Sequence, residues 1–155
     1  DRVTLVDWLD ADLRFGAGRA DGIFFAEAWR AVKDAEAHDG APPLLAIAEL
    51  AAAMRSTAEL ALESGQQGVA FLAAVRRAWP HPLLDRHAEA LRMAGITPVL
   101  PVAAGIACAI HDIPLDLAVP LYLHAGAANL INAAVRLVPL GQSDGLMALA
   151  ALETA

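Results

Sequence analysis

The chain carries a long stretch, from Leu44 to Glu63, in which apolar residues recur every three or four positions. These apolar positions are Leu44, Ile47, Ala48, Ala51, Met54, Ala58 and Ala61. The charged residues fall largely on another side of the stretch: Glu49, Arg55, Glu59 and Glu63. Such spacing is typical of an amphipathic helix with one face in a core, so we expect helices to build the fold.

The apolar residues are mostly alanine and leucine. Hydrophobic residues make up 57% of the 155 positions, whereas aromatic residues make up only 5%. Small, unbranched side chains favour closely packed helices over a sheet, which is rich in β-branched and aromatic residues. A chain of this length can hold one ordinary core. We therefore predict a single all-α domain over residues 1–155, with about seven to eight helices.

Proline and glycine mark the expected helix boundaries. A break is expected over residues 38–43, which contain His, Asp, Gly and two prolines. Gly65 is expected to interrupt or kink the third helix, and Pro120 to kink or restart the helix that begins after Pro114. The expected helices cover residues 4–13, 21–36, 44–63, 69–77, 83–93, 99–109, 121–137 and 146–152.

A lone cation, Arg136, stands near the end of the otherwise apolar segment 133–138. Pro139 cannot extend a helix without the loss of a backbone hydrogen bond, and Gly141 permits a left-handed turn. The polar residues 142–144 can cap a following helix. Arg136 therefore needs a partner, unless its side chain extends from a buried helix end into water.

The chain is acidic, with a formal net charge of −7. A surface that binds nucleic-acid phosphates needs clustered basic residues, so we expect no nucleic-acid partner. Cys108 is the one cysteine, which rules out an internal disulfide and suits a reducing compartment such as the cytoplasm. The longest apolar stretch, residues 96–110, is shorter than the roughly 20 residues that span a membrane. We therefore expect a core helix there and no membrane partner.

Motifs that mark nucleotide-dependent enzymes are absent from the sequence. Gly16 and Gly18 lack the third glycine of a dinucleotide-binding fingerprint and follow a helical pattern instead of a strand. The one lysine, Lys33, lies in a helical stretch and not in a phosphate-binding loop. We therefore expect no catalytic residues and no bound cofactor.

Glu59 and Glu63 are four positions apart and therefore share a face of the expected helix. Such a pair can serve acid–base chemistry, a partner contact or a solvated helical face. Arg55 precedes Glu59 by the same helical step. The simplest structural interpretation is an intrahelical ion pair worth about 0.3 kcal/mol.

One group of residues offers a metal site as the alternative. Cys108, His111 and Asp112 lie within about one helical turn, and His124 is the nearest fourth ligand. On this alternative the chain is a small helical metal-binding protein or a metal-dependent enzyme that uses these four residues. The simpler interpretation is a buried cysteine that packs as a small apolar group and a histidine that ends a helix.

Three blocks of sequence, in a fixed order, carry a resemblance to a known family. They are Gly16, Gly18, Arg19 and Asp21 with residues 28–30; then Arg55, Thr57, Glu59, Leu60, Glu63, Gly68 and Phe71; then Tyr122, Leu123, Asn129 and residues 133–142. In these blocks the chain is similar to the urease accessory protein F family. The family's Gly-rich, aromatic opening segment and its His-Glu-Thr-containing tail have no counterpart here. We therefore expect the chain to be the core of such a protein.

The resemblance implies a nickel-insertion chaperone component without catalysis of its own. Family members associate with urease accessory protein D, called H in some systems, and with the GTPase accessory protein G. They form dimers and act on urease apoprotein while its two-nickel site is filled. Arginine suits the centre of such interfaces, because its planar donor fork satisfies carboxylates where water is excluded. The expected partner-binding residues are Arg136, Gln142, Arg55, Glu59, Glu63, Arg19 and Asp21.

Overall fold

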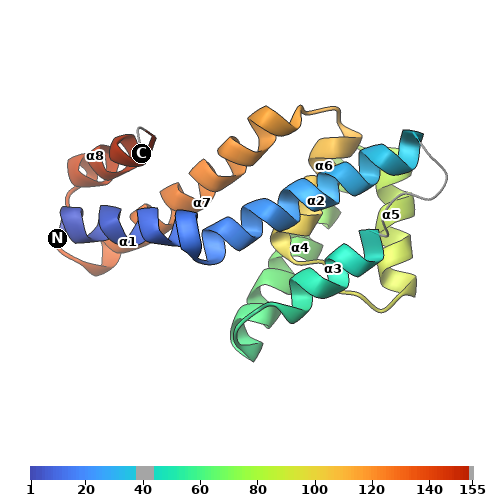
Figure 1. Cartoon of the computed structure of the whole chain (residues 1–155), viewed down its shortest axis with the longest axis horizontal. Coiled ribbons are helices and arrows are strands. Elements are labelled where there is room, and N and C mark those ends of the chain that lie inside the picture. Colours follow the sequence, from blue (N-terminus) through green and yellow to red (C-terminus); the bar gives the residue numbers. More distant parts are fainter. Residues whose placement is uncertain (38–43, 154–155) are drawn as a thin grey trace. The chain divides into compact units, whose positions relative to one another are not determined.

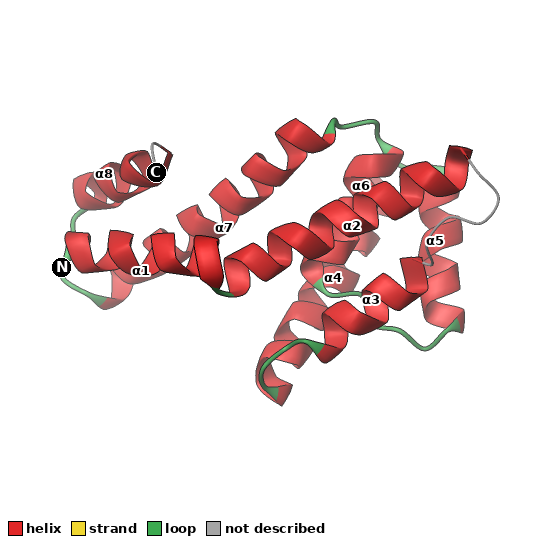
Figure 2. Ribbon diagram, viewed as in Figure 1, coloured by secondary structure: helices red, strands yellow, loops and turns green. Residues whose placement is uncertain are grey.

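The computed structural model describes residues 1–37 and 44–153, and these residues form eight α-helices (Figure 1). Figure 2 shows helices and loops and no strand in these ranges, so the predicted all-α fold is confirmed. The helices are α1 (Arg2–Phe15), α2 (Ala17–Ala37), α3 (Leu44–Ala53), α4 (Ala58–Ala78), α5 (Pro82–Met93), α6 (Leu100–Ile110), α7 (Leu115–Leu137) and α8 (Gln142–Glu153). The predicted break over residues 38–43 lies outside the described residues.

Contacts between Cα atoms divide the chain into two compact units. The larger unit comprises residues 23–119. The smaller unit comprises residues 1–22 together with residues 120–155. Helices α2 and α7 each contribute residues to both units. A single domain over residues 1–155 therefore stays a prediction.

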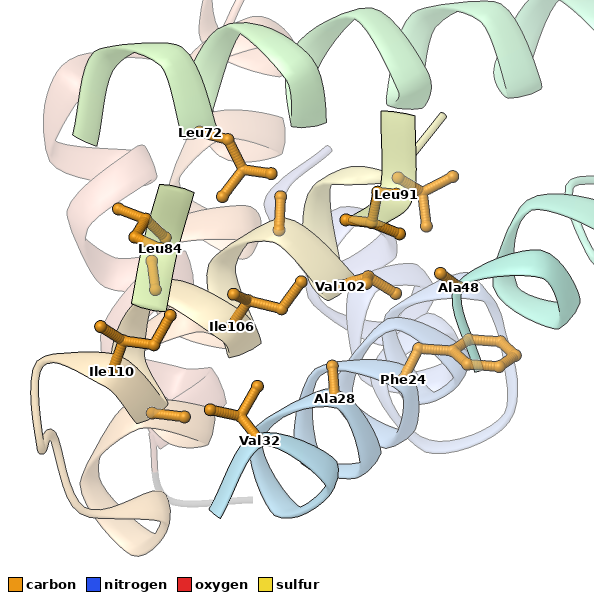
Figure 3. Close-up of a cluster of buried hydrophobic side chains, with 14 of the residues drawn as sticks. Phe24, Ala28, Val32, Ala48, Leu72, Leu84, Leu91, Val102, Ile106 and Ile110 are labelled. Carbon is orange, nitrogen blue, oxygen red and sulfur yellow. The ribbon is translucent and has the colours of Figure 1, made fainter. Parts of the chain in front are cut away.

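Helix α6 forms the centre of the larger unit. Nine of its eleven residues are buried, and both α4 and α5 pack against it. Figure 3 shows its side chains within one apolar cluster that also draws on α2, α4 and α5: Val102, Ile106 and Ile110 with Ala28, Val32, Leu72, Leu84 and Leu91. Each fully buried leucine or isoleucine contributes about 1.5–3 kcal/mol to stability. The predicted core helix over residues 99–109 is confirmed.

Two glycines allow backbones to approach closely around α6. A Cβ atom built at Gly68 of α4 would lie 2.0 Å from the carbonyl oxygen of Pro98. A Cβ atom at Gly105 of α6 would lie 2.4 Å from the carbonyl oxygen of Phe25. Both neighbours are backbone atoms in a close-packed interior, so a larger residue at either position forces the segments apart.

The predicted single helix over residues 44–63 is wrong, because α3 ends at Ala53 and α4 begins at Ala58. Thr57 has an extended backbone, and its hydroxyl oxygen accepts a hydrogen bond from the Leu60 N–H at 3.2 Å. This side chain is the N-cap of α4 and starts a new helix there. Gly65, which was expected to interrupt a helix, lies buried inside α4.

Helix α7 runs from Leu115 to Leu137 through Pro120, so the predicted restart at this proline is wrong. Pro120 and Asp116 are both exposed, so water can reach the carbonyl group that loses its helical hydrogen bond. By length and composition alone, α7 is the one helix in the described ranges that could cross a membrane. Helices of soluble proteins pass the same test.

The smaller unit has a small apolar core, in which α1 and α8 pack against each other. Its buried cluster consists of Leu9, Ile131 and Ala148 within the described ranges, with partly buried residues such as Val135 around it. A unit with so few buried side chains opens more easily than one with a large core. Most of the stability therefore resides in the larger unit.

Helix α2 begins at Ala17, four residues before the predicted start at residue 21. The Asp12 carboxylate accepts hydrogen bonds from the backbone N–H groups of Ala17 and Gly18, both at 3.0 Å. A carboxylate from the preceding helix thus caps the first turn of α2.

The Gly68→Ala substitution is expected to lower the free energy of unfolding by about 1–3 kcal/mol, because its Cβ would collide with the Pro98 carbonyl oxygen. Gly126→Ala is the matched control, since a Cβ at this position of α7 meets no atom within 4 Å. The control is expected to raise the free energy of unfolding by about 0.5–1 kcal/mol. Urea unfolding followed by circular dichroism measures both changes, and equal effects would contradict the packing around α6.

Candidate functional site

An exposed corner between α3 and α4, residues 50–63, holds three of the predicted partner-binding residues. Arg55 lies in the turn between the helices, and its Nε donates a hydrogen bond to the Ala51 carbonyl oxygen at 3.4 Å. Glu59 and Glu63 are exposed on α4. Because Arg55 lies outside both helices, the predicted intrahelical ion pair with Glu59 is wrong.

The carboxylates of Glu59 and Glu63 in the α3–α4 corner each accept local hydrogen bonds. The backbone N–H of Glu59, and after it the Thr57 hydroxyl, hydrogen-bond to the Glu59 carboxylate and lower its pKa. Glu63 accepts a hydrogen bond from Gln67 Nε2 at 3.1 Å. Glu59 and Glu63 are four positions apart on one helix. Their side chains therefore present acceptor oxygens on the same exposed face.

Large apolar side chains are exposed beside these charges. Leu50, Met54 and Leu60 are 56%, 59% and 48% exposed. Met54 was expected on the buried face of one helix over residues 44–63, but it is exposed because the chain leaves the helix at residues 54–57. The serine and threonine that precede Ala58 were the local signal for a new helix. A surface that mixes arginine, carboxylates and exposed apolar groups has the composition of a protein–protein interface.

A second exposed corner, residues 136–144, joins α7 to α8. Arg136 lies in the last turn of α7, where a cation is favoured by the helix dipole, and forms no hydrogen bond or ion pair in the described ranges. Gln142, the first residue of α8, is also exposed. Beside them the Leu137 side chain is 86% exposed. The arginine thus reaches solvent from an exposed helix end, and its side chain is available to another molecule.

The α7–α8 corner is held by a side-chain cap at the start of α8. Asp144, in the first turn of α8, accepts a hydrogen bond from the Gly141 N–H at 3.2 Å. The Gly141 carbonyl oxygen in turn accepts a hydrogen bond from the Gly145 N–H at 3.1 Å. The predicted capping role of residues 142–144 is therefore confirmed for Asp144.

Arg19 and Asp21 lie in the first turns of α2 and form hydrogen bonds with different partners. Arg19 is exposed, and its Nη1 donates a hydrogen bond to the Arg14 carbonyl oxygen at 3.3 Å. Asp21 is half-buried and accepts a hydrogen bond from the Tyr122 hydroxyl at 3.4 Å. Asp21 therefore links α2 to α7 within the smaller unit, a structural role that sequence spacing alone did not indicate.

Within the described ranges, the structure does not gather the four residues of the metal alternative into one cluster. Within the described residues, no group of three or more His, Cys, Asp or Glu side chains is arranged to hold a metal ion. Burial raises the pKa of the half-buried Cys108 thiol, which disfavours the thiolate that binds metals. His111 packs edge-on against His81, Asp112 pairs with Lys33 at 2.6 Å, and His124 Nδ1 lies 3.4 Å from Glu153.

Comparisons with known proteins give one consistent result. The model of the UreF family matches residues 1–153. The chain is 47% identical over 155 residues to urease accessory protein UreF of Rhodopseudomonas palustris strain HaA2, a match that covers 100% of the chain and 62% of the relative. It is 43% identical over 154 residues to the protein of that name from Magnetococcus marinus, with 98% and 63% covered. The chain thus spans about three fifths of the length of these curated relatives. No solved structure matches.

The ion pair between Lys33 and Asp112 makes stability depend on pH. The hydrogen bond and the charge of Lys33 lower the pKa of Asp112. A lowered pKa in the folded state adds stability that is present above the unfolded value, near 4, and is lost as pH falls through the folded value. Asp112→Asn keeps a side chain that tolerates the positive φ of 55° but removes the charge. We expect it to melt at a lower temperature than the parent at pH 7.

The difference in melting temperature between Asp112→Asn and the parent is expected to shrink as the pH falls below about 4. Asp7→Asn is the control, because Asp7 is an exposed carboxylate of α1 with no ion pair in the described ranges. Thermal unfolding between pH 3 and pH 7, about the range in which carboxylates titrate, provides the measurement. A constant difference at all pH values would contradict this role for the Asp112 charge.

Proposed function

Because the chain belongs to the urease accessory protein UreF family, we propose that it acts as a helical adaptor in the maturation of urease. The family consists of accessory proteins and not of enzymes. The observation that carries the proposal is the family match over residues 1–153, which includes all eight described helices. The proposed partners are urease accessory protein D or H, the GTPase accessory protein G and urease apoprotein, with nickel as the cargo of the assembly.

The distribution of chemical groups supports an adaptor. The described residues include two exposed corners in which charged side chains lie beside apolar side chains. Such mixed surfaces bind other proteins through a few anchoring residues surrounded by contacts that exclude water.

Arg136 is the proposed anchor of the α7–α8 corner. Its guanidinium is exposed beside the exposed Leu137, so a partner that covers the leucine also removes water from the arginine. In that setting a carboxylate of the partner forms a strong, charge-assisted hydrogen bond with the planar donor fork. Gln142 supplies further donors and acceptors at the start of α8.

Two further properties belong to the same proposal. A cytoplasmic location suits an adaptor whose single cysteine is free. Self-association into a homodimer suits a chain that leaves many large apolar side chains exposed, such as Trp8, Phe15 and Leu121.

The Arg136→Ala substitution is expected to change the free energy of unfolding by less than about 0.5 kcal/mol, because the exposed side chain forms no hydrogen bond or ion pair in the described ranges. Its affinity for accessory protein D or accessory protein G is expected to fall about tenfold or more. Co-expression with both proteins, followed by quantitative co-purification and titration, provides the measurement.

Arg86→Ala is the matched control, since Arg86 is an exposed arginine of α5 that also forms no ion pair in the described ranges. It is expected to bind like the parent. Loss of helical signal in Arg136→Ala at unchanged affinity would show that the arginine serves the fold and would refute its role as an anchor.

A further inference from the structure

The α3–α4 corner leaves large apolar side chains open to solvent on both of its helices. Leu50 lies in the last turn of α3 and Met54 in the turn that follows, whereas Leu60 and Leu62 lie in the first two turns of α4. Leu62 is 62% exposed, and the other three are exposed to a similar degree. Because only residues 54–57 separate the two helices, the end of α3 adjoins the start of α4 (Figure 1). Exposed apolar groups gathered in this way are typical of a protein interaction site.

The carboxylates beside these apolar side chains are not neutralised by cations. Glu49, Glu59 and Glu63 are exposed, and none of them forms an ion pair in the described ranges. The hydrogen-bond partners of Glu59 and Glu63 are neutral groups. Arg55 is the one cation within residues 49–63, and it is half-buried. The carboxylates there outnumber the cations, so the corner carries an excess of negative charge.

The helical geometry of α4 places these charges between apolar groups. With about 3.6 residues per turn, Glu59 and Glu63 follow one line along the exposed face, with Leu60 on one side of the line and Leu62 on the other. A partner that covers both leucines therefore also removes water from the two carboxylates. A carboxylate that loses water without gaining a cation or a hydrogen-bond donor is costly in free energy. The corner thus selects a partner that carries cations next to apolar side chains.

We propose that the α3–α4 corner binds a basic amphipathic helix of a partner protein. The apolar stripe of such a helix, at positions i, i+3, i+4 and i+7, would cover the exposed leucines. Its lysine or arginine side chains would form charge-assisted hydrogen bonds with Glu59 and Glu63. A second copy of the chain is disfavoured as the ligand, because the formal net charge of each copy is −7. The inference rests on the adaptor proposal and specifies the chemistry of the partner at one of its two corners.

A direct test uses a synthetic peptide of about 18 residues, or about five helical turns, with leucine at i, i+3, i+4 and i+7 and lysine on its flanks. The peptide carries a fluorescent label, and fluorescence anisotropy measures its binding to the whole chain. A second peptide has glutamate in place of lysine, and a third keeps the composition but scrambles the leucine stripe. We expect saturable binding of the first peptide and at least about tenfold weaker binding of the other two.

Two variants of the chain locate the bound peptide. Glu63→Lys reverses a charge of the corner, and Leu62→Ser removes an exposed apolar group beside it. Each is expected to weaken binding about tenfold. Asp7→Lys and Leu117→Ser are the matched controls, because both residues are exposed on helices outside the corner. The controls are expected to bind like the parent, and circular dichroism confirms that each variant keeps the helical content of the parent.

Three outcomes would overturn the inference. Equal weakening by Glu63→Lys and Asp7→Lys would show a general charge effect. Equal binding of unstructured polylysine would show attraction of any polycation. If Glu63→Lys instead dissociates a dimer of the chain, as measured by sedimentation, the corner holds a second copy and not a basic helix.

The peptide assays separate this inference from the adaptor proposal, because they contain no urease protein. If the first peptide fails to bind while the parent chain still co-purifies with accessory protein D or G, only the inference about the α3–α4 corner is refuted. If the peptide binds but the parent chain co-purifies with neither accessory protein, the adaptor proposal is refuted instead.

Discussion

The structure of the larger unit depends on the burial of α6 from several sides at once. An almost entirely apolar helix has no polar face that can contact water. Its neighbours must therefore pack closely enough to exclude water from every side of the helix. Gly68 and Gly105 make this approach possible, because any side chain there would meet a backbone carbonyl group within 2.0–2.4 Å. Alanine-rich helices also allow this close approach, because small side chains let the helix axes lie near one another. The scarcity of aromatic residues in the chain follows from this mode of packing.

A core of this kind leaves the charged residues at the ends and outer faces of the helices. No residue of the described buried core is polar or charged. Among the proposed binding residues, Asp21 and Arg55 are half-buried and form internal hydrogen bonds, whereas the others are exposed. Arg136 at the end of α7 and the carboxylates of the α3–α4 corner are therefore free to serve other molecules. A protein that binds partners through such surfaces supplies shape and charge to the contact.

The sequence by itself determined the all-α class, the core helix around residues 99–109 and the family, because periodicity, composition and motif order are local properties of the chain. It did not determine the break at Thr57, since the apolar spacing continues across a boundary that a single side-chain hydrogen bond creates. Nor did it show that α7 continues through Pro120, which depends on solvent reaching the exposed carbonyl group. The contact of His111 with His81 and the ion pair of Asp112 with Lys33 were decided by tertiary packing alone. The spacing of residues along one helix determines which of them share a face. Only the packing of the helices determines which other residues that face contacts.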